Sequence, residues 1–180
     1  MARRVIAYKF LAAGAVAPFT RFRWPIGEWV EAEAVDPCRH GIHACRVRDL
    51  PIWLGRELWE VELDGEVVEL ERKLVAARGR LNRRLDAWND ALASEFGRFC
   101  VRRTRERVGF LPHLAGFAAD VERFVSQRRI PIAGFAAARA AELRDGPVAY
   151  EQERLMQAAW LAERLGLELP NGAGSLLAPE

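Results

Sequence analysis

Four side chains that can bind a metal or act as nucleophiles lie within eight residues: Cys38, His40, His43 and Cys45. Thiolates and imidazoles are zinc ligands, but structural zinc sites usually combine two closely spaced ligands with two from elsewhere in the fold. A short strand cannot easily wrap four donors around one ion. We therefore predict no metal and no other cofactor, and interpret Cys38 and Cys45 as small core residues.

Nucleophilic catalysis is the second chemistry that this segment could support. Side chains two residues apart in a strand share a face, so His43 could activate Cys45. Asp49, Glu60 or Glu62 could orient the imidazole. The candidate catalytic residues are His43, Cys45 and Glu60, and the sequence leaves open whether the protein is an enzyme.

Aromatic residues follow the same segment, which suggests a binding site. Trp53 and Trp59 lie just downstream of His43. The candidate ligand-binding residues are Cys38, His43, Trp53 and Trp59. The leading interpretation is an intracellular binding module with a pocket near His43, Trp53 and Trp59 for an unknown small molecule or protein. We expect the His43 imidazole to be mostly buried and held by a hydrogen bond.

Strands must position these residues. Alternating apolar residues and turn signals predict strands at residues 5–10, 28–32 and 42–45, then a short helix at 50–54. Strands at 58–63 and 66–70 are predicted to form a hairpin around Asp64-Gly65, a dipeptide typical of two-residue turns. Residues 73–80 fit either a strand or the start of a helix.

Helices dominate the second half of the chain. From Leu81 the apolar period is three to four, through Leu85, Trp88, Leu92, Phe96 and Phe99, which predicts an amphipathic helix to about Val108. Pro112 and Pro131 open two further helices, and a last helix over 148–165 ends at Gly166.

The predicted fold class is therefore α+β. A small antiparallel or mixed sheet over about residues 5–76 precedes a bundle of about four helices. We expect a β-rich domain at 1–80, a helical half at 81–167 packed on it as one cooperative unit, and a disordered tail at 168–180.

Charge raises an alternative function. The net charge is +2, but residues 72–129 hold 14 basic and 6 acidic groups. Nucleic-acid binding through the arginine-rich segment 72–107 is a less favoured alternative, because the aromatic residues there lie on the apolar stripe. Phe19, Phe22 and Trp24 also alternate with Arg21 and Arg23, and we expect these rings to fold onto the sheet.

Sequence features also bear on location. No run of 18 apolar residues exists, which predicts no membrane span. The N-terminus imitates a signal peptide, but Lys9 interrupts its apolar run. An odd number of cysteines, three, favours a reducing interior, so we expect a cytoplasmic protein.

Four motifs carry a resemblance to known sequences: Gly27-Glu28-Trp29-Val30-Glu31-Ala32, Cys38-x2-Gly41-x-His43-Ala44-Cys45, Leu50-Pro51-x-Trp53-Leu54 and Leu58-Trp59-Glu60-Val61-Glu62-Leu63. They resemble an uncharacterised family of high-GC Gram-positive bacteria, over about residues 5–80. The second motif and the Glu-Val-Glu strand are also similar to an uncharacterised domain of phage-related proteins. The resemblance implies a fold and no activity. The order of elements is similar to that of ADP-ribosyltransferase-like folds, which is a further enzyme alternative.

Overall fold

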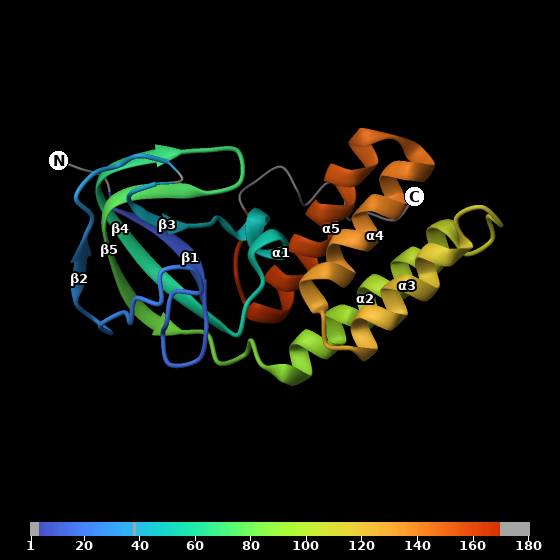
Figure 1. Ribbon diagram of the computed structural model, residues 1–180, viewed down its shortest axis with the longest axis horizontal. Coiled ribbons are helices and arrows are strands. Elements are labelled where there is room, and N and C mark those ends of the chain that lie inside the picture. The colour runs from blue at the N-terminus through green and yellow to red at the C-terminus, as the bar shows by residue number, and fades with distance from the viewer. Residues whose placement is uncertain (1–3, 38, 170–180) are drawn as a thin grey trace. The chain divides into compact units, whose positions relative to one another are not determined.

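The computed structural model describes residues 4–37 and 39–169, and the chain divides into two compact units, residues 1–88 and 89–180 (Figure 1). The first unit holds the sheet and the second holds four long helices, which confirms the α+β class. Cys38 lies outside the described residues, and so does residue 170 onward of the predicted tail.

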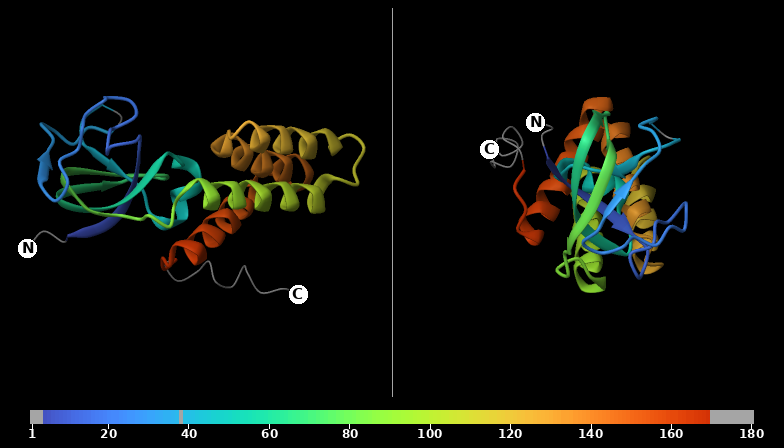
Figure 2. Two further views of the ribbon diagram at one scale, coloured as in Figure 1. Left: turned by 90° about the horizontal axis from the view of Figure 1, so that it is seen from below. Right: turned by 90° about the vertical axis from the view of Figure 1, so that its left-hand side faces the viewer.

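The sheet of the first unit is antiparallel. Its strands are β1 (Val5–Leu11), β2 (Trp29–Glu31), β3 (Ile42–Ala44), β4 (Glu57–Glu69) and β5 (Leu74–Arg84), in the order β1-β4-β5-β2. Strand β3 pairs with β5 beside β2. Hydrogen bonds between Tyr8 and Cys45 then connect the end of β3 to β1, so the sheet curls back on itself (Figure 2).

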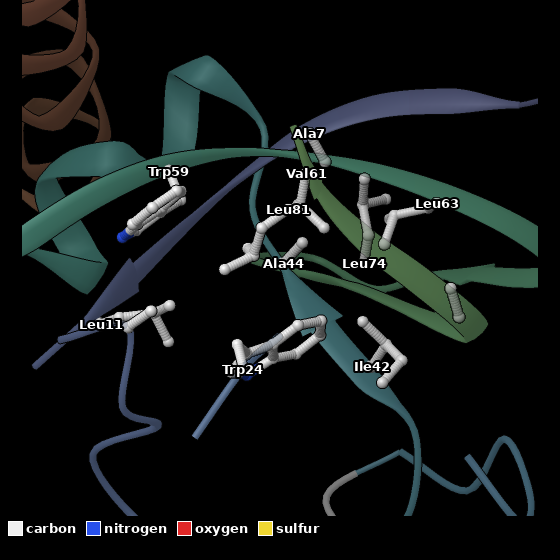
Figure 3. Packing of buried hydrophobic residues seen from close by; sticks show 12 residues of the cluster. Ala7, Leu11, Trp24, Ile42, Ala44, Trp59, Val61, Leu63, Leu74 and Leu81 are labelled. Carbon is white, nitrogen blue, oxygen red and sulfur yellow. The ribbon is translucent and has the colours of Figure 1, made fainter. Parts of the chain in front are cut away.

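The concave side of this curled sheet is filled with apolar side chains. Its buried members are Ala7, Leu11, Ala15, Trp24, Ile42, Ala44, Trp59, Val61, Leu63, Leu74, Ala76 and Leu81. Ala15 and Trp24 come from the loop after β1, and the others come from alternate positions of the strands, because successive side chains of a strand point to opposite faces. Figure 3 shows Trp24 between Leu11 and Ile42, facing the side chains of the long strands. We call this space the sheet interior.

The predicted hairpin at Asp64-Gly65 is wrong. Strand β4 continues through both residues and pairs with β5 on either side of them. The pairing advances from Asp64 opposite Arg78 to Val67 opposite Ala76, so β4 has one extra residue, a β-bulge. Gly65 has φ of 78°. A bulge of this kind needs the same positive φ as a hairpin turn, so the dipeptide is typical of both.

The helix predicted from Leu81 also begins elsewhere. Residues 81–84 belong to β5, and helix α2 (Asp90–Val108) starts after Asn89, whose side chain accepts hydrogen bonds from the amides of Ala91 and Leu92 at 3.0 Å. Leu81 faces the sheet interior. Its spacing from the residues that follow fits a helical period by coincidence.

Four helices form the second unit, as predicted: α2, α3 (Ala115–Ser126), α4 (Ile130–Asp145) and α5 (Pro147–Leu165). Helix α4 contacts the other three. Its buried face is mostly alanine, which lets neighbouring helices approach closely. The interior of this unit also contains polar side chains: Glu153 is buried, and its carboxylate accepts hydrogen bonds from Arg103 Nε at 3.2 Å to each oxygen and from Arg103 Nη2 at 2.7 Å.

Candidate functional site

A lysine enters the sheet interior. On β1, Lys9 lies between Ala7 and Leu11, which belong to the apolar core, and it is opposite Trp59 of β4. Its Nζ donates a 2.5 Å hydrogen bond to the carbonyl oxygen of His43 and lies 5.2 Å from the centre of the Trp24 ring. Backbone and ring thus hold the ammonium where water is largely excluded.

This position perturbs the ionisation of Lys9. Burial disfavours the charged ammonium and lowers the pKa of Lys9 to about 8, and the nearby Cys45 only partly offsets that effect. Perturbed pKa values often mark functional sites, but structural groups show them too. Lys9 is the titratable group that sequence reasoning missed, because both faces of residues 5–11 are rich in apolar residues.

The candidate nucleophile Cys45 is poorly suited to attack. Its thiol is buried, and burial together with the Asp49 carboxylate raises the pKa of Cys45. The thiol therefore stays protonated at neutral pH, while nucleophilic cysteines act as thiolates. Asp49 is itself buried and engaged by Arg46 at 2.8 Å.

The other two candidate catalytic residues have separate surroundings. The His43 side chain is half-buried, and its imidazole has no hydrogen-bond partner among residues 4–37 and 39–169, contrary to expectation. Burial and the charges of Lys73 and Lys9 lower the pKa of His43. Glu60 pairs with Arg83 at 3.0 Å across β4 and β5. A positioned acid, base and nucleophile are not assembled from these side chains.

The predicted ligand-binding residues that the structure describes have different surroundings. Trp59 is in the sheet interior, with its indole nitrogen 3.0 Å from Glu57 Oε2. Trp53 ends helix α1 (Leu50–Trp53), and its indole donates to the Arg72 carbonyl at 2.8 Å. His43 alternates with the core residues Ile42 and Ala44, so it faces away from the interior. Cys38 lies outside the described residues.

In the described ranges, no group of three or more histidine, cysteine, aspartate or glutamate side chains is arranged to hold a metal ion. His40 is exposed in the loop before β3.

An exposed aromatic loop lies beside the interior. Residues 12–24, here called the aromatic loop, connect β1 to the segment before β2. Trp24 is 5% exposed and folds into the interior as predicted, but Phe22 is 44% exposed and Phe19 is 89% exposed. The expectation that all three rings fold onto the sheet is therefore correct for Trp24 alone.

Backbone hydrogen bonds give the aromatic loop a defined shape. Ala17 N donates to Phe22 O at 2.8 Å, and Arg21 N donates to Ala17 O at 3.0 Å. Ala15 and Arg21 have φ of 57° and 60°, a region that residues with a side chain seldom adopt. The loop is thus locked around a tip that displays Phe19.

Glu57 of β4 anchors the base of the aromatic loop. Its two carboxylate oxygens accept the backbone N–H groups of Gly14 at 2.9 Å and Ala15 at 3.1 Å. Desolvation opposes ionisation, but these bonds, the Trp59 indole and Arg84 together lower the pKa of Glu57. The carboxylate is therefore ionised at neutral pH and ties the loop to the sheet.

The arginines of segment 72–107 are divided between the two units. Those on β5 face carboxylates of neighbouring strands: Arg78 with Asp64 and Glu31, Arg80 with Glu62, Arg83 with Glu60, and Arg84 with Glu57. Such a ladder of pairs neutralises most of the positive charge of the strand. The segment is therefore not one continuous basic surface.

Comparison with known proteins finds one domain model that matches part of the chain. A domain described as Domain of unknown function (DUF7666) covers residues 5–93, which ends close to the boundary at Trp88. This match is consistent with the predicted resemblance to an uncharacterised family. No curated protein and no solved structure matches the chain. Among the described residues, no helix is both long and apolar enough to cross a membrane.

Proposed function

We propose that the protein is a binding module whose first unit inserts Phe19 of the aromatic loop into an apolar pocket of a partner protein. One observation carries the proposal: a phenylalanine that is 89% exposed stands on a loop whose backbone is fixed by its own hydrogen bonds. An aromatic side chain left in water gains the most from burial in a complex.

The shape of the loop supports binding. Ordering a flexible loop on association costs free energy, and a loop already ordered in the free protein avoids that cost. The positive φ values of Ala15 and Arg21 each oppose folding by roughly 1 kcal/mol. The loop retains these conformations because Glu57 and the backbone hydrogen bonds hold it. A rigid aromatic anchor is the usual centre of an interface.

The neighbouring charges indicate the chemistry of the partner. Arg21 and Arg23 flank the exposed rings, and neither forms an ion pair within the described part of the chain. Unpaired arginines beside an aromatic anchor favour a pocket with an acidic rim, because charge complementarity accelerates and orients association. The proposed partner is therefore an acidic protein surface with an apolar depression about the size of a phenyl ring.

For the cellular setting of the protein we propose what the sequence predicts. It is the cytoplasm of a high-GC Gram-positive bacterium, with relatives of the first unit in phage-related proteins. The enzyme alternatives stay predictions. The protonated thiol of Cys45 argues against a cysteine nucleophile, and incubation with labelled nicotinamide dinucleotide tests the ADP-ribosyltransferase alternative.

A photocrosslinking experiment tests the proposal. Phe19→benzoylphenylalanine is irradiated in cells of the source organism, and Phe110→benzoylphenylalanine, at an equally aromatic but unrelated site 64% exposed in the second unit, is the control. We expect one protein adduct specific to position 19. With that partner purified, Phe19→Ala should weaken binding by about 30-fold, or about 2 kcal/mol. The thermal midpoint should not change, because Phe19 makes little contact in the free protein.

Several results would overturn the proposal. Equal adducts at positions 19 and 110, or an identified partner that binds Phe19→Ala as tightly as the unchanged protein, would remove its basis. Vesicles of anionic and of neutral lipid provide the last comparison. If they sediment the protein, and Phe19→Ala abolishes this without any protein adduct, the loop is a membrane contact and not a protein contact.

A further inference from the structure

A groove runs between two helices of the second unit. Five residues of α2 and three of α3 line it: Arg98, Val101, Arg102, Arg105, Glu106, Glu122, Val125 and Ser126. Its volume is about 550 Å³. The arginines are exposed, so the groove opens to solvent.

The floor of the groove is apolar. Val101 and Val125 are half-buried there. The helices approach closely because Gly97 has no side chain: a methyl group at that position would lie 3.0 Å from both methyls of Val125 and from Ile130. This close approach leaves a shallow apolar strip instead of a deep cavity.

Two positive charges beside the strip lack partners. Arg105 pairs with Glu122 across the groove. In contrast, Arg98 and Arg102 form no ion pair with any described residue; Arg102 lies 5.9 Å from the Phe99 ring centre. They are four residues apart, so they project from the same side of α2. One end of the groove is therefore both apolar and positively charged.

We propose that this groove binds an acidic amphipathic helix of a partner protein. The lining residues of α2 cover eight residue steps, from Arg98 to Glu106, or roughly 12 Å, which matches about two turns of a helix. Apolar side chains of the ligand at i, i+3 or i+4 rest on Val101 and Val125. Two carboxylates four residues apart on the ligand face Arg98 and Arg102. Nucleic acid fits less well, because Glu106 and Glu122 line the same groove.

A charge-swap experiment with peptides tests the inference on the full chain. Two fluorescent helical peptides of about 14 residues, long enough to form a helix, share leucines at helical spacing. One carries two glutamates four residues apart beside the leucines, and the other carries lysines at the same positions. We expect the acidic peptide to bind at least about tenfold more tightly in fluorescence anisotropy, and the double variant Arg98→Glu/Arg102→Glu to reverse this preference.

The control variant makes the same change of charge elsewhere. Arg21→Glu/Arg23→Glu alters two exposed arginines of the first unit, and we expect it to leave both peptide affinities unchanged. It should abolish binding of the aromatic-loop partner, so the two proposals fail independently.

Three outcomes would overturn the groove proposal. The acidic peptide fails to bind at millimolar concentration, both peptides bind alike, or Arg98→Glu/Arg102→Glu retains the original preference. A labelled RNA duplex is measured in parallel. If the duplex alone binds, and the double variant loses it, the groove is a polyanion site and the peptide-binding inference is wrong.

Discussion

Replacing Lys9 with methionine tests whether an ammonium is held inside the curled sheet. Methionine has a similar length and fills the same space without a charge. In the folded protein, burial lowers the pKa of Lys9 from its usual 10.5 to about 8. Unfolding returns the amine to water and restores the ordinary pKa.

The sign of the effect follows from the direction of this shift. Between pH 8 and 10.5 the unfolded chain binds more protons at Lys9 than the folded protein does, so the free energy of unfolding rises with pH. One pKa unit corresponds to about 1.4 kcal/mol. The charge therefore costs roughly 3 kcal/mol at pH 7 and about 1.4 kcal/mol at pH 9.5, a gain of about 2 kcal/mol for the unchanged protein over this range.

The absolute stability of Lys9→Met at pH 7 is less informative than its pH dependence. The substitution removes the buried charge, but it leaves the His43 carbonyl oxygen without its donor, which costs roughly 1–3 kcal/mol. These two effects offset each other. The change in the free energy of unfolding between pH 7 and pH 9.5 is not subject to this cancellation, because the hydrogen bond to the His43 carbonyl is absent from the variant at both pH values.

Urea melts of both proteins at pH 7 and pH 9.5 provide the assay. Burial raises the pKa of Cys45 and of Cys100, so these thiols favour unfolding as pH rises. Both proteins share this effect, so the difference between them isolates Lys9. We expect that difference to shift by about 2 kcal/mol in favour of the unchanged protein. Lys73→Met, which removes the only other lysine of the sequence, controls for net charge. Parallel pH dependence of Lys9→Met and the unchanged protein would show that the ammonium remains hydrated, and would refute the reasoning.

Three further changes test other parts of the fold. Trp88→Ala should destabilise the first unit by about 3–5 kcal/mol in a urea melt, because the buried indole contacts Phe10 and donates to the Gly55 carbonyl. Arg102→Ala, at an exposed position, should change the free energy of unfolding little, and equal effects of the two substitutions would contradict this packing. Glu153→Ala should lower the free energy of unfolding by about 3–5 kcal/mol, because it leaves Arg103 without its buried partner. Glu122→Ala breaks an exposed pair and should cost less than about 1 kcal/mol, so similar losses of stability would show that burial of the pair is unimportant. His43→Ala should cost at most about 1 kcal/mol in free energy of unfolding, since the backbone carbonyl of residue 43 still accepts from Lys9. Because the pKa of His43 is lowered in the folded protein, its protonation opposes folding, so the variant should lose less stability than the unchanged protein as pH falls through 6.5. A cost above about 3 kcal/mol would reveal a structural imidazole.

Local patterns predicted most of the elements. Strands at residues 5–10, 28–32 and 42–45, the short helix after Asp49 and the last three helices all occur within a few residues of their expected positions, whereas α2 begins nine residues later than predicted. Each depends on periodicity or on a turn or cap residue nearby in the chain. Gly166, for example, ends α5 with φ of 65°, as its position after an apolar helix predicted.

The candidate site could not be assembled in the same way. His43, Trp53 and Trp59 are close in sequence, but alternation sends His43 away from the interior, while pairing with β1 and β5 brings Trp59 into it. The sequence also did not predict that Phe19 is exposed, because this exposure depends on the hydrogen bonds within the loop and between the loop and Glu57. Neighbouring residues alone do not specify which face becomes buried.

The sequence by itself determined the α+β class, most of the strands and helices, and the end of α5 at Gly166, because short-range sterics and periodicity control them. Only the tertiary structure decided that Asp64-Gly65 is a bulge, that α2 begins at Asp90, and that Lys9 is enclosed. Each of these depends on a strand distant in the chain: β5 pairs with both halves of β4, and the end of β3 closes against β1 over the lysine. Such long-range pairing selects among local conformations that are nearly equal in free energy.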